Sequence, residues 1–207
     1  MARKFVLLDV LRVAWKGLIS QIWLLAGLLI GYVIVCLSLI LFIPFPEQGS
    51  MSVAGIAIAL LCMVFSLLFS LGYTQNMFQT LDGEEPQFSA YGQQSRKIIT
   101  WLIAGLIYTI IVIAGLALLV LPGIYLAIRL QFFYTSIVEE DTGIVTSLKR
   151  SWEITRGQTM PLFLLLLMVI GFTVLGLAFG VIGIFVTCPL TGLMYCYVFR
   201  KLTAFTD

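Results

Sequence analysis

Residues 98–133 read IITWLIAGLIYTIIVIAGLALLVLPGIYLAIRLQFF, and this stretch decides the class of fold. From Ile98 to Val120 it carries no charged side chain and is long enough to cross the hydrocarbon of a bilayer as a helix, which takes about 20 residues. The tripeptide Leu-Pro-Gly then marks a turn, and a shorter apolar run follows to Phe133. The stretch therefore predicts two membrane-spanning helices joined by a tight turn, with one cation, Arg129, inside the second helix.

The same apolar character extends over the whole chain of 207 residues. Hydrophobic side chains make up 61% of it and charged ones only 11%, which leaves too little charge to cover a soluble surface. No hydrophilic segment is long enough to form a second domain, so we expect residues 1–207 to form a single, all-α integral membrane domain. The six expected transmembrane helices cover residues 18–43, 52–72, 98–120, 123–138, 161–179 and 183–200.

The positions of lysine and arginine predict which loops face the cytoplasm, because short cytoplasmic loops are enriched in both residues. With six spans, both termini share one side with the loops 81–97 and 139–160. The basic residues on that side are Arg3, Lys4, Arg12, Lys16, Arg96, Lys97, Lys149, Arg150, Arg156, Arg200 and Lys201. The opposite side carries Glu47 and no basic residue. Both termini are therefore predicted to be cytoplasmic.

Two segments that precede spans are similar to each other, because both carry the pattern Leu-x-x-small-Trp. They are residues 1–17, which contain Trp15, and residues 144–157, which contain Trp152. Both plot as amphipathic helices, typical of helices that lie in the membrane interface with tryptophan at headgroup depth. FSAYGQQSRK before the third span is a weaker copy. The pattern predicts three parallel units of interfacial helix, span, turn and span; the alternative is that such loop helices are common and imply no repeat.

Small residues and prolines predict where helices pack closely or break. Two pairs of glycines spaced four residues apart place small residues on one helix face, which permits close approach of a neighbouring helix. Prolines within apolar runs are candidate helix breaks, which at membrane depth occur where the backbone lines a cavity. The candidate packing and break residues are Gly27, Gly31, Gly176, Gly180, Pro122 and Pro189.

Residue types that usually carry catalysis or bind cofactors are scarce. The chain has no histidine, which removes the commonest metal ligand and the usual general base near neutral pH. Its four cysteines lie in apolar runs without a Cys-x-x-Cys pair, so we interpret them as packing residues. The acidic run Glu139-Glu140-Asp141 is expected to be a solvated turn; the alternatives are a metal site, or an N-cap or ion pair that Glu139 forms with the basic face of the following helix. We therefore expect no catalytic, metal-binding or cofactor-binding residues, no enzyme activity and no nucleic-acid partner.

Arg129 lies about 10 Å along its helix from Pro122, at a rise of 1.5 Å per residue, and therefore within the hydrocarbon. A charge at that depth costs about 3 kcal/mol on insertion scales, and no carboxylate lies in any apolar run to pair with it. Three roles are open. Arg129 bonds Gln131, Thr135 or backbone carbonyls inside the bundle; it snorkels to the inner headgroups; or it holds an anionic group in a cavity.

Residues 121–157 resemble part of a large prokaryotic family of six-span membrane proteins. The similarity rests on LPGIYLAIRLQFF, VEEDTG and SLKRSWEITRG, and it is weaker in LDGEEPQFSAYG and FVTCPLTGLMYCYVFR. That family includes the membrane domain of some glycerophosphoryl diester phosphodiesterases and many proteins of uncharacterised function. The resemblance implies a six-helix fold in a prokaryotic plasma (inner) membrane. It implies no activity, because the phosphodiesterase chemistry of the fused members belongs to a separate soluble domain.

These observations favour a non-enzymatic scaffold or accessory subunit of a membrane complex. Its apolar exterior is expected to contact lipid and another membrane protein or a second copy, while its basic inner rim rests on anionic headgroups. The rim residues expected to make these contacts are Arg12, Trp15, Lys16, Lys149, Arg150, Trp152 and Arg156. The alternative is a transporter or lipid-handling protein with an anion or lipid-headgroup site near Arg129.

Overall fold

The computed structural model describes residues 5–42 and 52–205, and within these ranges the chain forms helices and turns but no strand. The elements are α1 Leu7–Leu41, α2 Val53–Asp82, α3 Ser89–Gln94, η1 Ser95–Lys97, α4 Ile98–Leu118, α5 Val120–Leu130, α6 Phe133–Glu139, α7 Ile144–Ile154, α8 Thr159–Ala178 and α9 Gly180–Thr203. Six helical stretches in the described part are long and apolar enough to cross a membrane, which confirms the predicted all-α fold. Glu47 and the outer ends of the segments expected at 1–17 and 18–43 lie outside the described residues.

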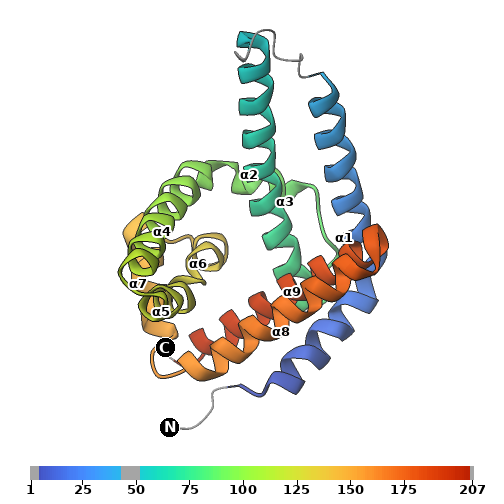
Figure 1. Cartoon of the computed structure of the whole chain (residues 1–207). Helices are drawn as coiled ribbons and strands as arrows, with labels where there is room; N and C mark the ends of the chain where they lie inside the picture. The colour runs from blue at the N-terminus through green and yellow to red at the C-terminus, as the bar shows by residue number, and fades with distance from the viewer. Residues whose placement is uncertain (1–4, 43–51, 206–207) are drawn as a thin grey trace.

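Three helical hairpins, α1 with α2, α4 with α5, and α8 with α9, surround a central space that contains the short helix α6 (Figure 1). The first hairpin is joined to the last because α1 also packs against α9. Each hairpin is preceded by a shorter helical segment, namely the start of α1, the pair α3 and η1, and α7. The order of elements is therefore the order of the three predicted units.

Within the described residues, the segments expected at 1–17 and 18–43 form one helix, α1, which has a kink at Gln21 (φ −135°, ψ 26°). Two side-chain hydrogen bonds accompany the kink, one within α1 and one to the loop after α2. The hydroxyl of Ser20 donates to the carbonyl of Gly17 at 2.7 Å, and the amide of Gln21 donates to the carbonyl of Glu84 at 2.7 Å. The kink separates the part of α1 with the rim cations from the part that spans the membrane.

The fourth span, expected as one helix over 123–138, is broken into α5 and α6 by a turn at Gln131 and Phe132. Neither residue is a proline or a glycine, so a tertiary contact must stabilise the break. The hydroxyl of Ser151 on α7 accepts from the N–H of Phe132 at 3.1 Å and donates to the carbonyl of Arg129 at 2.9 Å. These two bonds satisfy backbone groups that lipid cannot satisfy.

The prolines do not mark this interruption. Pro122 lies in the first turn of α5, where backbone N–H groups have no partner within the helix. The reversal before it is made by Leu119, whose backbone is extended (φ −162°, ψ 145°). Pro189 is buried inside α9, and the helix continues through it. The break expected at Pro189 is therefore wrong, and the one expected at Pro122 lies three residues earlier, at Leu119. The break at residues 131–132 was not predicted.

Close approach of helices occurs within two hairpins. A Cβ added to Gly123 of α5 would lie 2.6 Å from the backbone nitrogen of Leu116 on α4. A Cβ added to Gly183 of α9 would lie 2.2 Å from the carbonyl oxygen of Gly176 on α8. Gly180 has a positive φ of +69° and forms the turn between these two helices. Of the expected pair, Gly176 therefore lies at a helix contact and Gly180 at a reversal.

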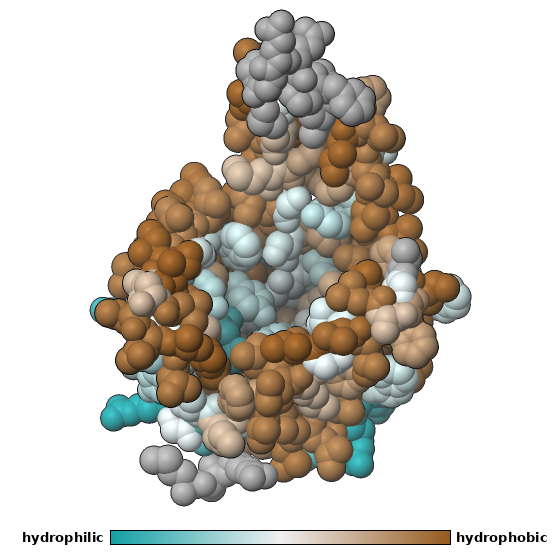
Figure 2. Space-filling model, in the orientation of Figure 1, coloured by the Kyte–Doolittle hydropathy of each residue, from teal (hydrophilic) through white to brown (hydrophobic). Residues whose placement is uncertain are grey.

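The outer surface of the molecule is apolar, as hydrocarbon contact requires. Many large apolar side chains of the spans face outward, and Trp23 on α1 is 89% exposed. Figure 2 shows this hydrophobic exterior and, framed by it, a hollow between the hairpins whose floor is hydrophilic. The buried apolar face of α1 consists of Val10, Ala14, Leu18, Leu25 and Leu29. An exterior this rich in large apolar side chains differs from the surface of a soluble domain and fits a bilayer as solvent.

Candidate functional site

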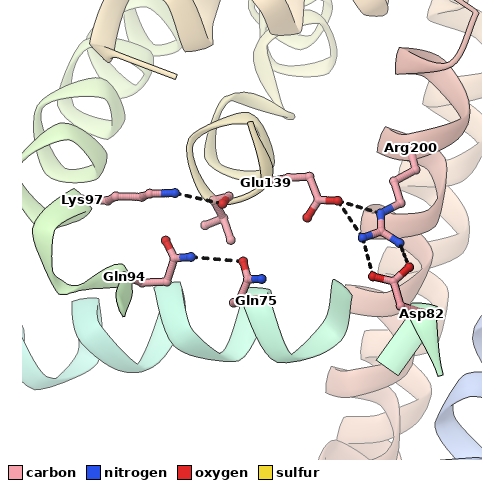
Figure 3. Close-up of polar contacts among 7 residues, drawn as sticks. Gln75, Asp82, Gln94, Lys97, Glu139 and Arg200 are labelled. Carbon is pink, nitrogen blue, oxygen red and sulfur yellow. Dashed lines mark hydrogen bonds and ion pairs between the residues drawn. The ribbon is translucent and has the colours of Figure 1, made fainter. Parts of the chain in front are cut away.

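A layer of polar side chains joins α2, α6 and α9 (Figure 3). Arg200 on α9 donates from Nε and Nη2 to Oε1 of Glu139 at 2.9 and 2.6 Å. Its Nη2 also donates to Oδ2 of Asp82, the last residue of α2, at 2.9 Å, and its Nη1 bonds Oδ1 of the same carboxylate. One planar guanidinium thus binds two carboxylates, a geometry that arginine offers and lysine does not.

The two acids that follow on the chain bind cations of two further elements. Glu140 accepts from Arg150 of α7 at 3.0 to 3.2 Å. Asp141 pairs with Lys97 of η1 at 3.0 Å, and Lys97 also donates to the carbonyl of Val138 at 3.0 Å (Figure 3). Only Asp141, with a side chain 80% exposed, is solvated as expected. The acidic run is therefore corrected from a solvated turn to a junction of η1, α6, α7 and α9.

Uncharged polar side chains continue this layer on α2 and α3. Gln94 donates to the side-chain oxygen of Gln75 at 3.1 Å (Figure 3), and Asn76 accepts from the backbone N–H of Gln87 at 3.2 Å. The amide nitrogen of Asn76 and the amide oxygen of Gln94 are buried without a hydrogen-bond partner among the described residues. A buried polar atom without a partner costs about 1–3 kcal/mol of folding free energy. These two atoms therefore destabilise the layer locally, whereas its ion pairs stabilise it.

Arg129 lies at the end of α5 against α7 and is only 3% exposed. The centre of its guanidinium is 4.2 Å from the ring centroid of Trp152 and 5.9 Å from that of Tyr125. Its Nε has no acceptor, and no carboxylate pairs with it, within the described part of the chain. The exposed cation Arg156 acts on it electrostatically. The guanidinium is thus covered by aromatic rings and lacks a counter-ion from the protein.

Gln131 and Thr135, the expected partners of Arg129, bond elsewhere or not at all. The hydroxyl of Thr135 donates to the carbonyl of Phe132 at 2.7 Å, and the amide nitrogen of Gln131 is buried without a partner among the described residues. The carbonyl of Arg129 also accepts from the hydroxyl of Thr155 at 3.1 Å. The backbone of Arg129 therefore has a structural role at the helix break, while its side chain rests against α7.

The expected rim residues lie on α1, on α7 and in the turn after α7, and they are largely exposed. Trp15 and Trp152 are both partly exposed. The exposed rim cations are Arg12, Lys16, Lys149 and Arg156. Arg150 differs, because it is half-buried against Glu140. The face of α7 that contacts the protein carries Ser147, Leu148, Ser151 and Ile154, so this helix is anchored to the bundle by polar as well as apolar groups.

An apolar groove of about 740 Å³ lies between α1, α2 and α3. Gly27 and Gly31 line its α1 side, and an added Cβ on either would meet no atom within 4 Å, which differs from the close helix contact expected there. A stack of aromatic rings also lines it and connects the three helices, with centroids 4.2 Å apart for Tyr32 of α1 and Phe69 of α2 and 5.9 Å apart for Phe69 and Tyr91 of α3. The volume lies within the range of roughly 300–1,000 Å³ that is typical of small-molecule sites.

No cluster that could hold a metal ion, with three or more His, Cys, Asp or Glu side chains, occurs within residues 5–42 and 52–205. The cysteines are free thiols: Cys36 and Cys62 are half-buried, Cys188 is exposed and Cys196 is buried.

The sequence did not predict two features of the structure, the groove and the junction at the acidic run. The glycine pair was the signal for the groove, and the three adjacent acids were the signal for the junction.

The fold and this polar layer define the chain as a polytopic, all-helical membrane protein. Residues 90–206, more than half of the chain, match the domain of unknown function DUF7847, and the chain belongs to this family. The matched region contains the acidic junction, Arg129 and α7, but not α1 or α2. The match provides no link to glycerophosphoryl diester phosphodiesterases, so that part of the resemblance is not supported. Neither a curated protein nor a solved structure matches the chain significantly.

Proposed function

We propose that this protein is a non-enzymatic lipid-binding membrane protein whose groove between α1, α2 and α3 holds an acyl chain. The observation that carries the proposal is the groove itself, which is apolar, has about 740 Å³ of space and opens on helices that face hydrocarbon. Open space beside Gly27 and Gly31, together with the aromatic rings of Tyr32 and Phe69, suits a slender, flexible apolar ligand.

The length of the groove supports an acyl chain from a single leaflet. On α1 the lining residues extend from Trp23 to Val35, which is about 18 Å at the helical rise of 1.5 Å per residue. One leaflet contributes about 15 Å of a hydrocarbon core that is about 30 Å thick. Ser95, beside the exposed Arg96, also lines the groove and places a polar group where a lipid headgroup would lie.

The proposed setting is a prokaryotic plasma membrane with both termini in the cytoplasm. It rests on the distribution of Lys and Arg between the loops. In this orientation the exposed cations of α1 and α7 meet the anionic headgroups of the inner leaflet. Trp15 and Trp152, both partly exposed, then lie at the depth where tryptophan is enriched.

A second candidate function, scaffold or accessory subunit, is favoured by the same glycine pair. Two small residues four positions apart, with no atom near them, permit close packing of a transmembrane helix from another chain. The stacked rings of Tyr32, Phe69 and Tyr91 would then contact that helix. The two functions predict different co-purifying material, so one experiment separates them.

The experiment fills the groove and identifies what the protein retains. The double variant Gly27→Leu, Gly31→Leu should lose lipid that the wild type keeps through purification in mild detergent, as counted by native mass spectrometry. The matched control is Gly171→Leu on α8, where an added Cβ also meets nothing within 4 Å and which does not line the groove. Unchanged lipid in the double variant, with loss of a co-purifying polypeptide, would contradict lipid binding and favour the scaffold.

A further inference from the structure

The positive charge of Arg129 is buried, and no described residue supplies a counter-ion for it. Arg129 as a whole is only 3% exposed, its Nε is buried without an acceptor, and no described carboxylate pairs with it. The other charge that acts on it is Arg156, which is also a cation and therefore repels it. A buried cation without a counter-ion costs several kcal/mol, and a second cation nearby raises that cost.

The aromatic neighbours reduce this cost but do not supply a negative charge. The ring of Trp152, 4.2 Å from the guanidinium centre, offers a cation–π contact, which is a weaker attraction than an ion pair with a buried carboxylate. The ring of Tyr125 lies farther away, at 5.9 Å. The two contacts offset only part of the cost of leaving the charge unpaired. A neutralising anion at this place would therefore stabilise the protein.

We propose that Arg129 and Arg156, beside Trp152, form a binding site for a phosphate group. Its residues come from α5, from α7 and, for Arg156, from the turn after α7, and none of them lines the groove between α1, α2 and α3. A guanidinium can donate two parallel hydrogen bonds to a phosphate, and an exposed second arginine can close on the anion from outside. Trp152 is partly exposed, and tryptophan is enriched at headgroup depth, where phosphodiesters are the abundant anions. Contact with this ring favours a position for Arg129 nearer the interface than its distance from Pro122 along α5 predicts.

The site differs from the acidic junction in one decisive respect. Each of the junction's cations Lys97, Arg150 and Arg200 has a carboxylate within 3.0 Å. Arg129 and Arg156, in the described part of the protein, have no carboxylate in an ion pair. The protein thus neutralises its other buried or half-buried cations internally and leaves this pair to a ligand.

The test measures binding of short-chain phosphatidylglycerol to the full-length protein in detergent, by native mass spectrometry and thermal shift. Diacylglycerol with the same chains, which lacks the phosphate, is the ligand control. Arg156→Gln, which changes an exposed residue and should not impair folding, is expected to weaken binding of phosphatidylglycerol at least tenfold. Arg129→Gln should abolish the binding, and Arg129→Lys should retain part of it. Lys149→Gln, an exposed cation on the same helix, is the matched control and should bind as wild type does.

Equal binding by wild type and Arg156→Gln, or equal binding of diacylglycerol, would overturn the proposal. A parallel titration with inorganic phosphate distinguishes the source of the anion. If inorganic phosphate competes with the lipid at similar concentration, the site takes free phosphate; if it does not, the site takes a lipid headgroup. The double variant Gly27→Leu, Gly31→Leu should leave this binding unchanged, so failure of the groove proposal and failure of this one are separate results.

Discussion

Ser151 is the residue on which the break in the fourth span depends. Its hydroxyl accepts from the N–H of Phe132 and donates to the carbonyl of Arg129, and the side chain is fully buried. A hydroxyl can do both because it is donor and acceptor at once. The amphipathic helix α7, which the sequence predicts to lie at the membrane interface, therefore supplies the polar group that bonds the broken backbone between α5 and α6.

Replacing this hydroxyl should destabilise the protein. Ser151→Ala leaves the N–H of Phe132 buried and without its acceptor, so we expect the free energy of unfolding to fall by about 1–3 kcal/mol. Reversible unfolding in mixed micelles measures it. The control is Ser147→Ala on the same helix, equally buried, whose hydroxyl only bonds the carbonyl of Ile144 within its own helix. Equal losses in the two variants would show that the bridge to α5 and α6 contributes nothing specific.

At the scale of elements, α6 is short but holds the bundle together. Its last residue, Glu139, binds Arg200 of α9, which in turn binds Asp82 at the end of α2. The next two acids bind α7 and η1. Isolated exposed ion pairs contribute little, but charges that share partners in a half-buried network are coupled. The inner ends of several helices are therefore tied to one turn.

A double-mutant cycle tests this coupling. Glu139→Gln and Arg200→Gln should be non-additive by about 0.5–3 kcal/mol of unfolding free energy, near the lower bound because both side chains are partly exposed. The control cycle pairs Glu139→Gln with Lys201→Gln, which removes an exposed cation next to Arg200 in the sequence. There we expect additivity. A coupling energy that is the same in both cycles would mean that the local net charge, and not the bonded pair, explains the effect.

At the scale of the whole molecule, three hairpins stand around a hollow with a hydrophilic floor (Figures 1 and 2). The apolar walls face lipid, and the ion-paired layer ties the hairpins to one another through α2, α6 and α9. Two groups of unused polar atoms lie inside this frame, at Asn76 and Gln94 and at Gln131.

The topology of this frame can be tested by labelling. In a cysteine-free variant, a cysteine placed at Glu85 in the loop after α2 should react with a membrane-impermeant maleimide only from the cytoplasmic side. A cysteine placed at Phe179, in the exposed turn between α8 and α9, should react only from the opposite side. Gel-shift labelling of intact cells and of inverted membrane vesicles measures both. Labelling of both positions from the same side would contradict the six-span topology.

The amino-acid sequence by itself predicts the membrane environment, the all-α fold and the approximate position of each span. This is possible because a helix that crosses hydrocarbon must be long and apolar, and such helices are recognised in a sequence as uncharged runs. It also places the two tryptophan-bearing helices and the basic residues around them. Tertiary structure decided what each polar group does. The break at Gln131 and Phe132, the binding of three adjacent acids to three different elements, and the open groove at Gly27 and Gly31 depend on groups distant in sequence. Hydropathy reports the environment of a segment, whereas a hydrogen bond or an ion pair depends on the partner that folding brings within about 3 Å.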